Sequence, residues 1–218
     1  MSEGLALDGV EISLDGRVLV GPLTLSIAPG ACATVMGPSG VGKSTLLAFV
    51  GGFLDSNFTA RGRVRIAGND VTALAPERRR AGILFQDDLL FPHLSVGENL
   101  AFGLARHVAG RHARRGAIEA ALANADLAGF SARDPATLSG GQRARVAVMR
   151  TLLAEPKALL LDEPFSKLDR QLREEFRAFV FAHARARRLP ILMATHDPED
   201  AAAAGGPVIA LRGAEKTA

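Results

Sequence analysis

The amino-acid sequence predicts an α/β fold with a mainly parallel sheet, an N-terminal antiparallel β layer and an inserted helical subdomain. Short apolar runs at Ala158–Leu161 and Ile191–Thr195 alternate with helical stretches such as Arg170 to about Arg188, which is typical of a parallel sheet. Several β-prone runs between Leu5 and Ile27 indicate the antiparallel layer. The length of 218 residues allows one large α/β domain or two small ones, and we expect a single domain over residues 1–218.

The N-terminal part of the chain supplies the expected strands. Turn signals divide the first segment into several short strands, and they are Asp8-Gly9, Asp15-Gly16 and Gly21-Pro22. Further strands are expected at Ala31–Met36, Gly62–Gly68 and Gly82–Phe85. Between the first two of these, Ser44–Val50 continues without a helix breaker until Gly51-Gly52, which predicts a short helix.

The middle of the chain is predicted to be helical. From about Phe91 to Leu127 the apolar residues recur at helical spacing, as at Ile118, Ala121, Leu122 and Ala125. We therefore expect a mostly helical subdomain over about residues 87–138, inserted in the α/β core. A further helix is expected at Gly141–Ala154, and the last strand at Pro207–Leu211.

A glycine-rich segment after Ala31–Met36 matches the pattern G-x-x-x-x-G-K-[ST]. Its residues are Gly37, Pro38, Ser39, Gly40, Val41, Gly42, Lys43, Ser44 and Thr45. In such a loop the backbone N–H groups point at phosphate oxygens, and the helix N-terminus adds partial positive charge. We expect Lys43 to reach the β- and γ-phosphates and the Ser44 hydroxyl to ligate Mg²⁺. The alternative is a glycine turn that happens to precede Lys-Ser.

Two adjacent carboxylates, Asp162 and Glu163, end the apolar strand Ala158–Leu161 in a Walker B pattern. A carboxylate at the C-terminal edge of a strand can hold Mg²⁺, and a second one beside it can deprotonate the attacking water. We therefore expect Asp162 to act on the metal and Glu163 to act as the base. The alternative is an acidic turn after a core strand, which is common on its own.

A second glycine-rich turn, Leu138-Ser139-Gly140-Gly141-Gln142, leads into a helix and so offers another N-terminus suited to an anion. With this stretch the chain resembles the ATP-binding cassette (ABC) family of ATPases, from about Leu5 to Leu211. Residues 138–142 match the signature sequence of the family residue for residue. The chain also supplies the other family motifs in the expected order, with Gln86 at the Q-loop, Ser166–Asp169 at the D-loop and His196 as the switch histidine.

The resemblance implies an ATP site that two chains share. Two cassettes would pack head to tail, so that Ser139 and Gly141 of one clamp the γ-phosphate of the ATP held by Lys43 of the other. The implied nucleotide-binding residues outside the phosphate loop are Ser139, Gly140, Gly141, Gln142 and Asp169. The implied catalytic residues are Glu163, His196 and Gln86, and the implied Mg²⁺ ligands are Ser44, Gln86 and Asp162.

The sequence departs from the family pattern at two places. The family usually has an aromatic residue in the early β layer that stacks on adenine, and Leu14 stands at the matching position. The D-loop carries Lys167 where a small residue is more usual, which adds a charge near the expected dimer interface. The Leu14 departure concerns the affinity for adenine, and the Lys167 departure concerns the assembly of the dimer.

The segment Gln86–Leu100 resembles the Q-loop and following helix of importer cassettes, which receive a short helix from the membrane subunit. Leu89, Leu90 and Phe91 are expected to form this docking patch, with core packing as the alternative reading. The resemblance thus implies an ATP-hydrolysing subunit that serves separate permease subunits, with a solute-binding protein as a further partner. A soluble ABC ATPase of DNA repair or translation is the competing hypothesis, and a nucleotide kinase is disfavoured by the signature sequence.

Composition sets further limits. The net charge of +3 is modest, so no nucleic-acid partner is expected. The basic clusters Arg78–Arg80, Arg111–Arg115 and Arg185–Arg188 are most simply solvated helix faces, with anionic lipid or an acidic partner as the alternative. No apolar run could span a membrane, and we expect no secretory signal and no C-terminal regulatory domain. With the single Cys32, these features make the cytoplasm the default location, and the resemblance implies a peripheral protein on the cytoplasmic face of the inner membrane.

Overall fold

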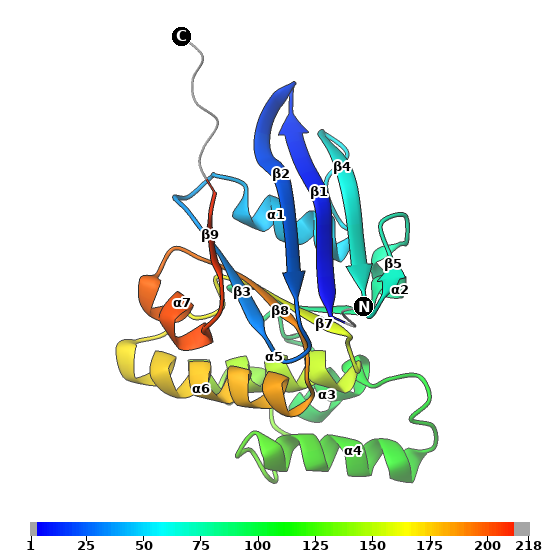
Figure 1. Ribbon diagram of the computed structural model, residues 1–218. Helices are drawn as coiled ribbons and strands as arrows, with labels where there is room; N and C mark the ends of the chain where they lie inside the picture. The colour runs from blue at the N-terminus through cyan, green and yellow to red at the C-terminus, as the bar shows by residue number, and fades with distance from the viewer. Residues whose placement is uncertain (1–3, 212–218) are drawn as a thin grey trace.

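The computed structural model describes residues 4–211, which form two β-sheets with helices packed against them (Figure 1). The larger sheet is wholly parallel and has the strand order β6-β7-β8-β3-β9. Its strands are β3 (Cys32–Met36), β6 (Ala81–Leu84), β7 (Ala158–Asp162), β8 (Ile191–Thr195) and β9 (Val208–Ala210). The predicted α/β class with a mainly parallel sheet is confirmed.

The second sheet is the antiparallel layer, with the order β2-β1-β4-β5. Its strands are β1 (Leu5–Leu14), β2 (Arg17–Ile27), β4 (Phe58–Ile66) and β5 (Asn69–Asp70). The prediction of several short strands was wrong, because β1 and β2 form one long hairpin that turns only at Asp15-Gly16. Asp8-Gly9 and Gly21-Pro22 lie within the strands, where shifts of register absorb them as bulges.

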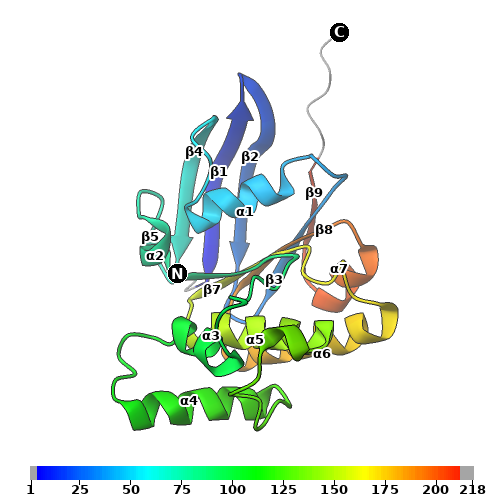
Figure 2. The same ribbon diagram turned by 180° about the vertical axis from the view of Figure 1, so that it is seen from behind.

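The helices occupy different faces of the parallel sheet (Figures 1 and 2). They are α1 (Lys43–Gly51), α2 (Pro76–Arg79), α3 (Val96–Gly103), α4 (Arg111–Asn124), α5 (Gly140–Leu153), α6 (Arg170–Ala186) and α7 (Pro198–Ala204), with a short 3₁₀ turn at Pro135–Thr137. Helix α1 lies between the two sheets, whereas α5 and α6 cover the opposite face of the parallel sheet. Helices α2 and α7 were not predicted.

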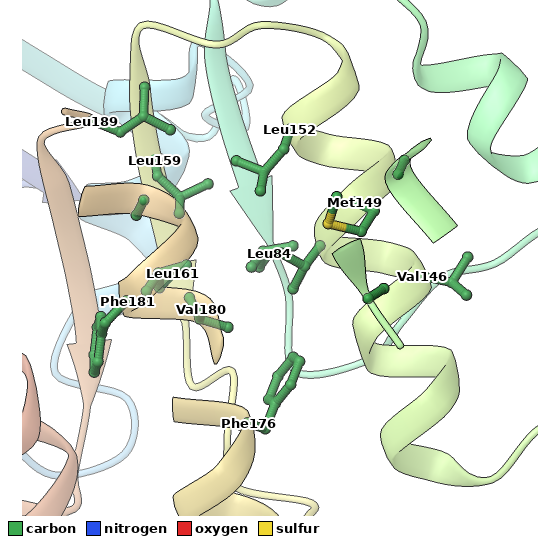
Figure 3. Close-up of a cluster of buried hydrophobic side chains, with 14 of the residues drawn as sticks. Leu84, Val146, Met149, Leu152, Leu159, Leu161, Phe176, Val180, Phe181 and Leu189 are labelled. Carbon is green, nitrogen blue, oxygen red and sulfur yellow. The ribbon is translucent and has the colours of Figure 1, made fainter. Parts of the chain in front are cut away.

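Two hydrophobic cores lie on the two faces of the parallel sheet. Along β7, Leu159 and Leu161 point to the core under α5 and α6, while Leu160 points to the core around α1. This alternation follows from the two-residue period of a strand and explains why β7 is apolar from Ala158 to Leu161. Figure 3 shows the first core, where Leu159 and Leu161 face side chains of α5 and α6.

The segment between β6 and α5 has the helical character that its spacing predicted, although α3 begins only at Val96. The irregular stretch before α3 is held by Asn99, which is fully buried. Its side-chain oxygen accepts from the N–H of Phe91 at 2.8 Å, and its amide donates to the carbonyls of Phe91, Leu94 and Ser95. The predicted helical core residues Ile118, Ala121, Leu122 and Ala125 are all buried.

One residue of the three basic clusters does not lie on a solvated face. Arg79 is 6% exposed, and its guanidinium donates to the carbonyls of Phe49, Val50, Thr72 and Leu74. The prediction was therefore wrong for this residue, because the end of α1 has carbonyls without helical partners and Arg79 supplies donors to them. Among residues 4–211, no helix combines the length and apolar character that crossing a bilayer requires.

Candidate functional site

The phosphate loop connects the C-terminal end of β3 to the N-terminus of α1, which is the arrangement that the motif predicts. Gly42 stands directly before the helix with φ of 102°, in the left-handed region that favours glycine. A Cβ atom there would also lie 2.8 Å from Cγ2 of Val20, so the loop packs tightly against β2. Glycine at this position therefore allows both the turn before α1 and the close contact between the phosphate loop and β2.

Lys43 lies under the loop and is only 5% exposed. Its Nζ donates to the carbonyl oxygens of Gly37 at 2.8 Å and Pro38 at 3.2 Å. The same nitrogen lies 3.3 Å from Oε1 of Glu163, so the charge of Lys43 is paired. The ammonium group is therefore held between the loop and the carboxylate that follows β7.

Asp162 and Ser44 meet where the two motifs come together. The Ser44 hydroxyl donates to Oδ1 of Asp162 at 2.9 Å, although the residues are far apart in the sequence. Burial raises the pKa of the Asp162 carboxyl above its usual value, and the adjacent Glu163 adds to this. The hydrogen bond from Ser44 and the charge of Lys43 act in the opposite direction. A divalent cation in contact with Asp162 would favour its ionised form.

Glu163 links the P-loop lysine to the switch histidine. Its Oε2 lies 2.6 Å from Nδ1 of His196, while its Oε1 faces Lys43. The backbone of Glu163 has φ of 48°, an unusual conformation for a residue with a side chain. The N–H of Glu163 donates to the carbonyl of Ala194 on β8 at 2.9 Å, and the carbonyl of Glu163 accepts from the hydroxyl of Ser166. Such a strained backbone is typical of functional sites in which the surroundings fix one conformation.

Lys43, Ser44, Asp162 and Glu163 line an open cleft of about 410 Å³, and His196 is connected to it through its contact with Glu163. Its lining consists of Ser39, Gly40, Gly42, Lys43, Ser44, Thr45, Gln86, Asp162 and Glu163. The structure thus brings Gln86 from the end of β6 beside the phosphate loop and the two carboxylates. Of the predicted residues in the loop, Val41 is instead buried, and Pro38 contributes its carbonyl to Lys43.

The Ser139–Gln142 turn belongs to a different part of the surface. Of the residues that the structure describes, none from this turn lines the cleft of the phosphate loop. Ser139 begins α5, and its hydroxyl accepts from the N–H of Gln142, while the Gln142 side chain accepts from the N–H of Ser139. Ser139 and Gly140 are exposed, so the N-terminus of α5 faces outward with its first amides.

Gly141 is buried where α5 packs against α6. A Cβ atom at this position would lie 2.6 Å from Cδ1 of Leu172, whereas a Cβ on Gly140 would meet nothing within 4 Å. Asp169 stands at the start of α6, where its carboxylate accepts from the N–H of Leu172 at 3.0 Å. Both residues therefore have clear structural roles in addition to the roles that the resemblance implies.

The D-loop lysine has a partner within the chain. Lys167 forms an ion pair with Asp87, the residue after Gln86, so its charge is partly balanced. The Q-loop residues that follow Asp87 are bound to α5. Arg143 contacts Asp88 at 2.9 Å, and Arg150 donates to the carbonyl of Leu89 at 2.8 Å. The Q-loop is thus tied to the D-loop on one side and to α5 on the other.

An exposed apolar patch borders the same loop. Leu89 is 54% exposed, as the docking prediction required, but Leu90 and Phe91 are partly buried. Phe102 of α3, which the sequence analysis did not select, is 70% exposed and stacks edge-on against Phe91 with ring centroids 4.7 Å apart. For Leu90, the alternative reading of core packing was therefore the better one, since it packs against the helical core.

Comparison with known proteins agrees with this geometry. A model of the ABC transporter family matches residues 20–166. The ABC transporter ATP-binding protein YnjD of Escherichia coli (strain K12) is 46% identical over 196 residues, which cover 90% of each chain. The thiamine import ATP-binding protein ThiQ of Rhizobium meliloti (strain 1021) is 41% identical over 210 residues, which cover 96% of this chain and 86% of ThiQ.

Other relatives extend beyond the matched region. The putative 2-aminoethylphosphonate import ATP-binding protein PhnT of Salmonella typhimurium (strain LT2) is 39% identical over 92% of this chain, which spans 54% of PhnT. Among solved structures, CbiO1 of Clostridium perfringens, part of the ABC transporter complex CbiONQ, has a TM-score of 0.84 and 26% identity over 97% of this chain and 86% of its own. From the family match, the relatives and the shared fold, we conclude that the chain belongs to the ABC transporter family, as an ATP-binding subunit with ATPase activity.

Proposed function

We propose that this ATPase subunit works as a head-to-tail dimer on separate membrane permease subunits and energises the import of a solute. The observation that carries the proposal is the chain of contacts from Lys43 through Glu163 to His196, beside the pair of Ser44 and Asp162. These residues come from three separate segments, and their meeting at the edge of the parallel sheet has no use in a purely structural domain. Import is supported by relatives named as import ATP-binding proteins, such as ThiQ.

The residues at the cleft divide the work of hydrolysis between them. The P-loop amides and Lys43 bind the β- and γ-phosphates. Glu163 orients the attacking water and accepts its proton. His196 holds the carboxylate of Glu163 on the side away from Lys43 and contacts the γ-phosphate. Gln86, at the mouth of the cleft, contacts the same water and connects the site to the exposed patch around Leu89.

The oxygen atoms at this site fit Mg²⁺. The Ser44 hydroxyl and the Asp162 carboxylate lie 2.9 Å apart, and both are the hard oxygen ligands that Mg²⁺ prefers. Within residues 4–211 no group of three or more His, Cys, Asp or Glu side chains forms a metal cage. This suits an ion that keeps several waters and arrives with substrate phosphates, with Ser44, Asp162 and Gln86 as its protein contacts. When bound, Mg²⁺ neutralises charge on the phosphates.

A second chain completes the site. Ser139, Gly140, Gly141 and Gln142 of the partner contact the γ-phosphate, since the exposed start of α5 offers amides that the phosphate loop of the same chain does not use. Asp169 lies at the contact between the chains. We further propose that residues 1–218 act as a single domain in which about 87–138 form the helical subdomain. The protein binds the cytoplasmic face of the inner membrane through its permease, and a solute-binding protein delivers the substrate.

Purification of the tagged full chain from detergent-solubilised membranes of its own host tests the transporter proposal. We expect a multi-spanning membrane protein at fixed stoichiometry, and faster ATP hydrolysis when both are reconstituted in vesicles. A Glu163→Gln version should capture the same membrane protein without hydrolysing ATP. Recovery of ribosomes or nucleic acid with no membrane protein would support the soluble ABC machine instead.

A further inference from the structure

Two catalytic loops of this chain are joined by one arginine that no motif includes. Arg173 lies in the first turns of α6, directly after the D-loop, and α7 begins next to this end of α6 (Figures 1 and 2). Its Nη1 donates to Oδ2 of Asp197 at 2.8 Å, and its Nη2 donates to the carbonyl of Leu168 at 3.2 Å. Asp197 follows His196, and Leu168 belongs to the D-loop. One guanidinium group therefore spans both loops.

Asp197 is fixed by more than this ion pair. Its second carboxylate oxygen accepts from the N–H of Glu199 and begins α7, while its own N–H donates to the Thr195 hydroxyl at 3.1 Å. The same hydroxyl donates to Asp200, which forms a buried ion pair with Arg177 at 3.0 Å. His196 thus stands between two residues whose positions are set by α6 and α7.

The D-loop is itself hydrogen-bonded to Glu163, the proposed base. The Ser166 hydroxyl donates to the carbonyl of Glu163 at 2.9 Å, and the N–H of Leu168 donates to the carbonyl of Phe165. The side chain of Glu163 in turn contacts His196 at 2.6 Å. The contacts therefore form a closed ring that runs from Glu163 through the D-loop, Arg173 and Asp197 to His196 and back to Glu163.

We propose that Arg173 is a positioning residue that holds His196 against Glu163 and makes this pairing depend on the place of the D-loop. The inference rests on the proposed function, in which Glu163 and His196 act on the attacking water and the γ-phosphate. Arg173 touches neither of these and acts through Asp197 and Leu168. The D-loop lies at the proposed dimer contact. When the second chain binds there and fixes the D-loop, Arg173 therefore also fixes the position of the catalytic histidine.

The shape of the arginine side chain is essential to this role. A guanidinium group presents its donors in a rigid planar fork, and here the two arms reach acceptors on different loops. A lysine has one nitrogen on a flexible chain, so it can keep the ion pair with Asp197 but cannot hold both acceptors in the same geometry. Arg173→Lys should therefore retain the fold and part of the activity.

Steady-state ATPase kinetics of the full chain tests the proposal. In Arg173→Met we expect kcat to fall by about 30-fold with KM within about twofold, because misplaced catalytic groups cost rate rather than binding. Arg173→Lys should recover part of the loss, and Asp197→Asn, which keeps the helix cap, should lose kcat to the same extent as Arg173→Met. Arg170→Met is the matched control, since Arg170 lies on the same helix, is 85% exposed and pairs only loosely with Glu174.

Two results separate this inference from the proposed function. With His196→Ala as background, adding Arg173→Met should cause no further loss, because residues that act as one unit are not additive. Wild-type kcat in folded Arg173→Lys and Asp197→Asn would overturn the role of Arg173, and so would a multiplicative loss in the double variant. If His196→Ala itself keeps full activity, then the proposed role of the histidine fails first. If Arg173→Met does not fold, the Lys and Asn variants decide the question.

Discussion

The two glycine-rich turns of this chain differ in what their polar groups contact. Around the phosphate loop, Lys43 and Ser44 reach across to Glu163 and Asp162 at the end of β7, so the cleft is assembled from several segments. At the other turn, Ser139 and Gln142 contact each other in a capping box. The first region is therefore a cleft formed by side chains from several segments, and the second is a helix N-terminus that faces outward.

This difference explains why one chain holds only part of the proposed mechanism. A helix N-terminus attracts anions, but it needs other groups to bind a ligand firmly. The exposed turn at Ser139 is suited to complete a site that already has a lysine and carboxylates. Substitutions in the two regions should thus have different effects on nucleotide binding and on hydrolysis.

The largest effect should come from Glu163→Gln. Loss of the proposed base should lower kcat by about 10³-fold, within the range for general base catalysis, while ATP affinity changes little. Phosphate release gives kcat, and equilibrium binding of a fluorescent ATP analogue gives affinity. Glu155→Gln is the control, because that carboxylate is half-exposed and lies 3.3 Å from His107, away from the cleft lining. Hydrolysis near the wild-type rate would remove Glu163 from the catalytic step.

Ser139→Arg should separate the two regions. We expect hydrolysis to fall by about 10²-fold, the usual loss when a donor to the transition state is removed. ATP affinity of the isolated chain should stay the same, because Ser139 does not line the cleft of the phosphate loop. Weaker ATP binding by the monomeric variant would contradict the comparison and would place both turns at one site.

Arg79→Met should test what makes the first region rigid. The substitution removes the guanidinium donors to carbonyls at the end of α1 and to the carbonyls of Thr72 and Leu74, so the free energy of unfolding should fall by about 3 kcal/mol. Urea unfolding followed by circular dichroism gives the value. Arg78→Met changes an exposed neighbour and should cost little. Equal stability of the two variants would show that the end of α1 does not depend on Arg79.

Gly141→Ala and Gly140→Ala sharpen the account of the second region. Both changes add the same methyl group to α5, but only the Cβ at Gly141 meets Leu172, at 2.6 Å. Since both gain helix propensity, Gly141→Ala should be less stable than Gly140→Ala by about 1–2 kcal/mol. Thermal unfolding compares them, and Leu172→Ala should reduce the difference. If the two variants melt together, α5 does not pack closely against α6 at this point.

The smallest effect concerns Cys32, the first residue of β3 in the parallel sheet. Burial raises the pKa of its thiol from 9.0 to about 12. The folded chain therefore keeps the thiol protonated at a pH where the unfolded chain ionises, so this contribution to stability is lost as pH rises above 9. Iodoacetamide should label Cys32 at pH 8 only after unfolding, as mass spectrometry of the intact chain would show. Fast labelling of the native protein would contradict the burial of Cys32.

Most elements of the fold could be predicted because their signals are local. The strands β7 and β8 follow from their short apolar runs, and the helices α5 and α6 follow from the longer stretches that alternate with these runs. The long hairpin of β1 and β2 could not, because Gly9 and Gly21-Pro22 are turn signals that bulges accommodate within strands. Helix α7 is short and rich in alanine, so its pattern has no apolar face to detect.

The site shows the same division. The cleft residues were found because the phosphate loop and the carboxylate pair are short motifs that reflect backbone needs. Contacts made by arginines were missed, since Arg79 and Arg173 bind carbonyls and carboxylates far away in the sequence. A charged residue in a helix usually indicates solvent, and only the tertiary structure shows which ones are exceptions.

ATP-dependent dimerisation of the Glu163→Gln chain tests the shared site most directly. Size-exclusion chromatography with and without Mg-ATP measures it, since removing the base should keep binding intact and trap the closed pair. We predict a dimer with Mg-ATP, a monomer without it, and a monomer in both conditions when Ser139→Arg is added. A chain that binds ATP and stays monomeric, or a dimer that Ser139→Arg does not disrupt, would contradict a site completed by the outward-facing turn of a second copy.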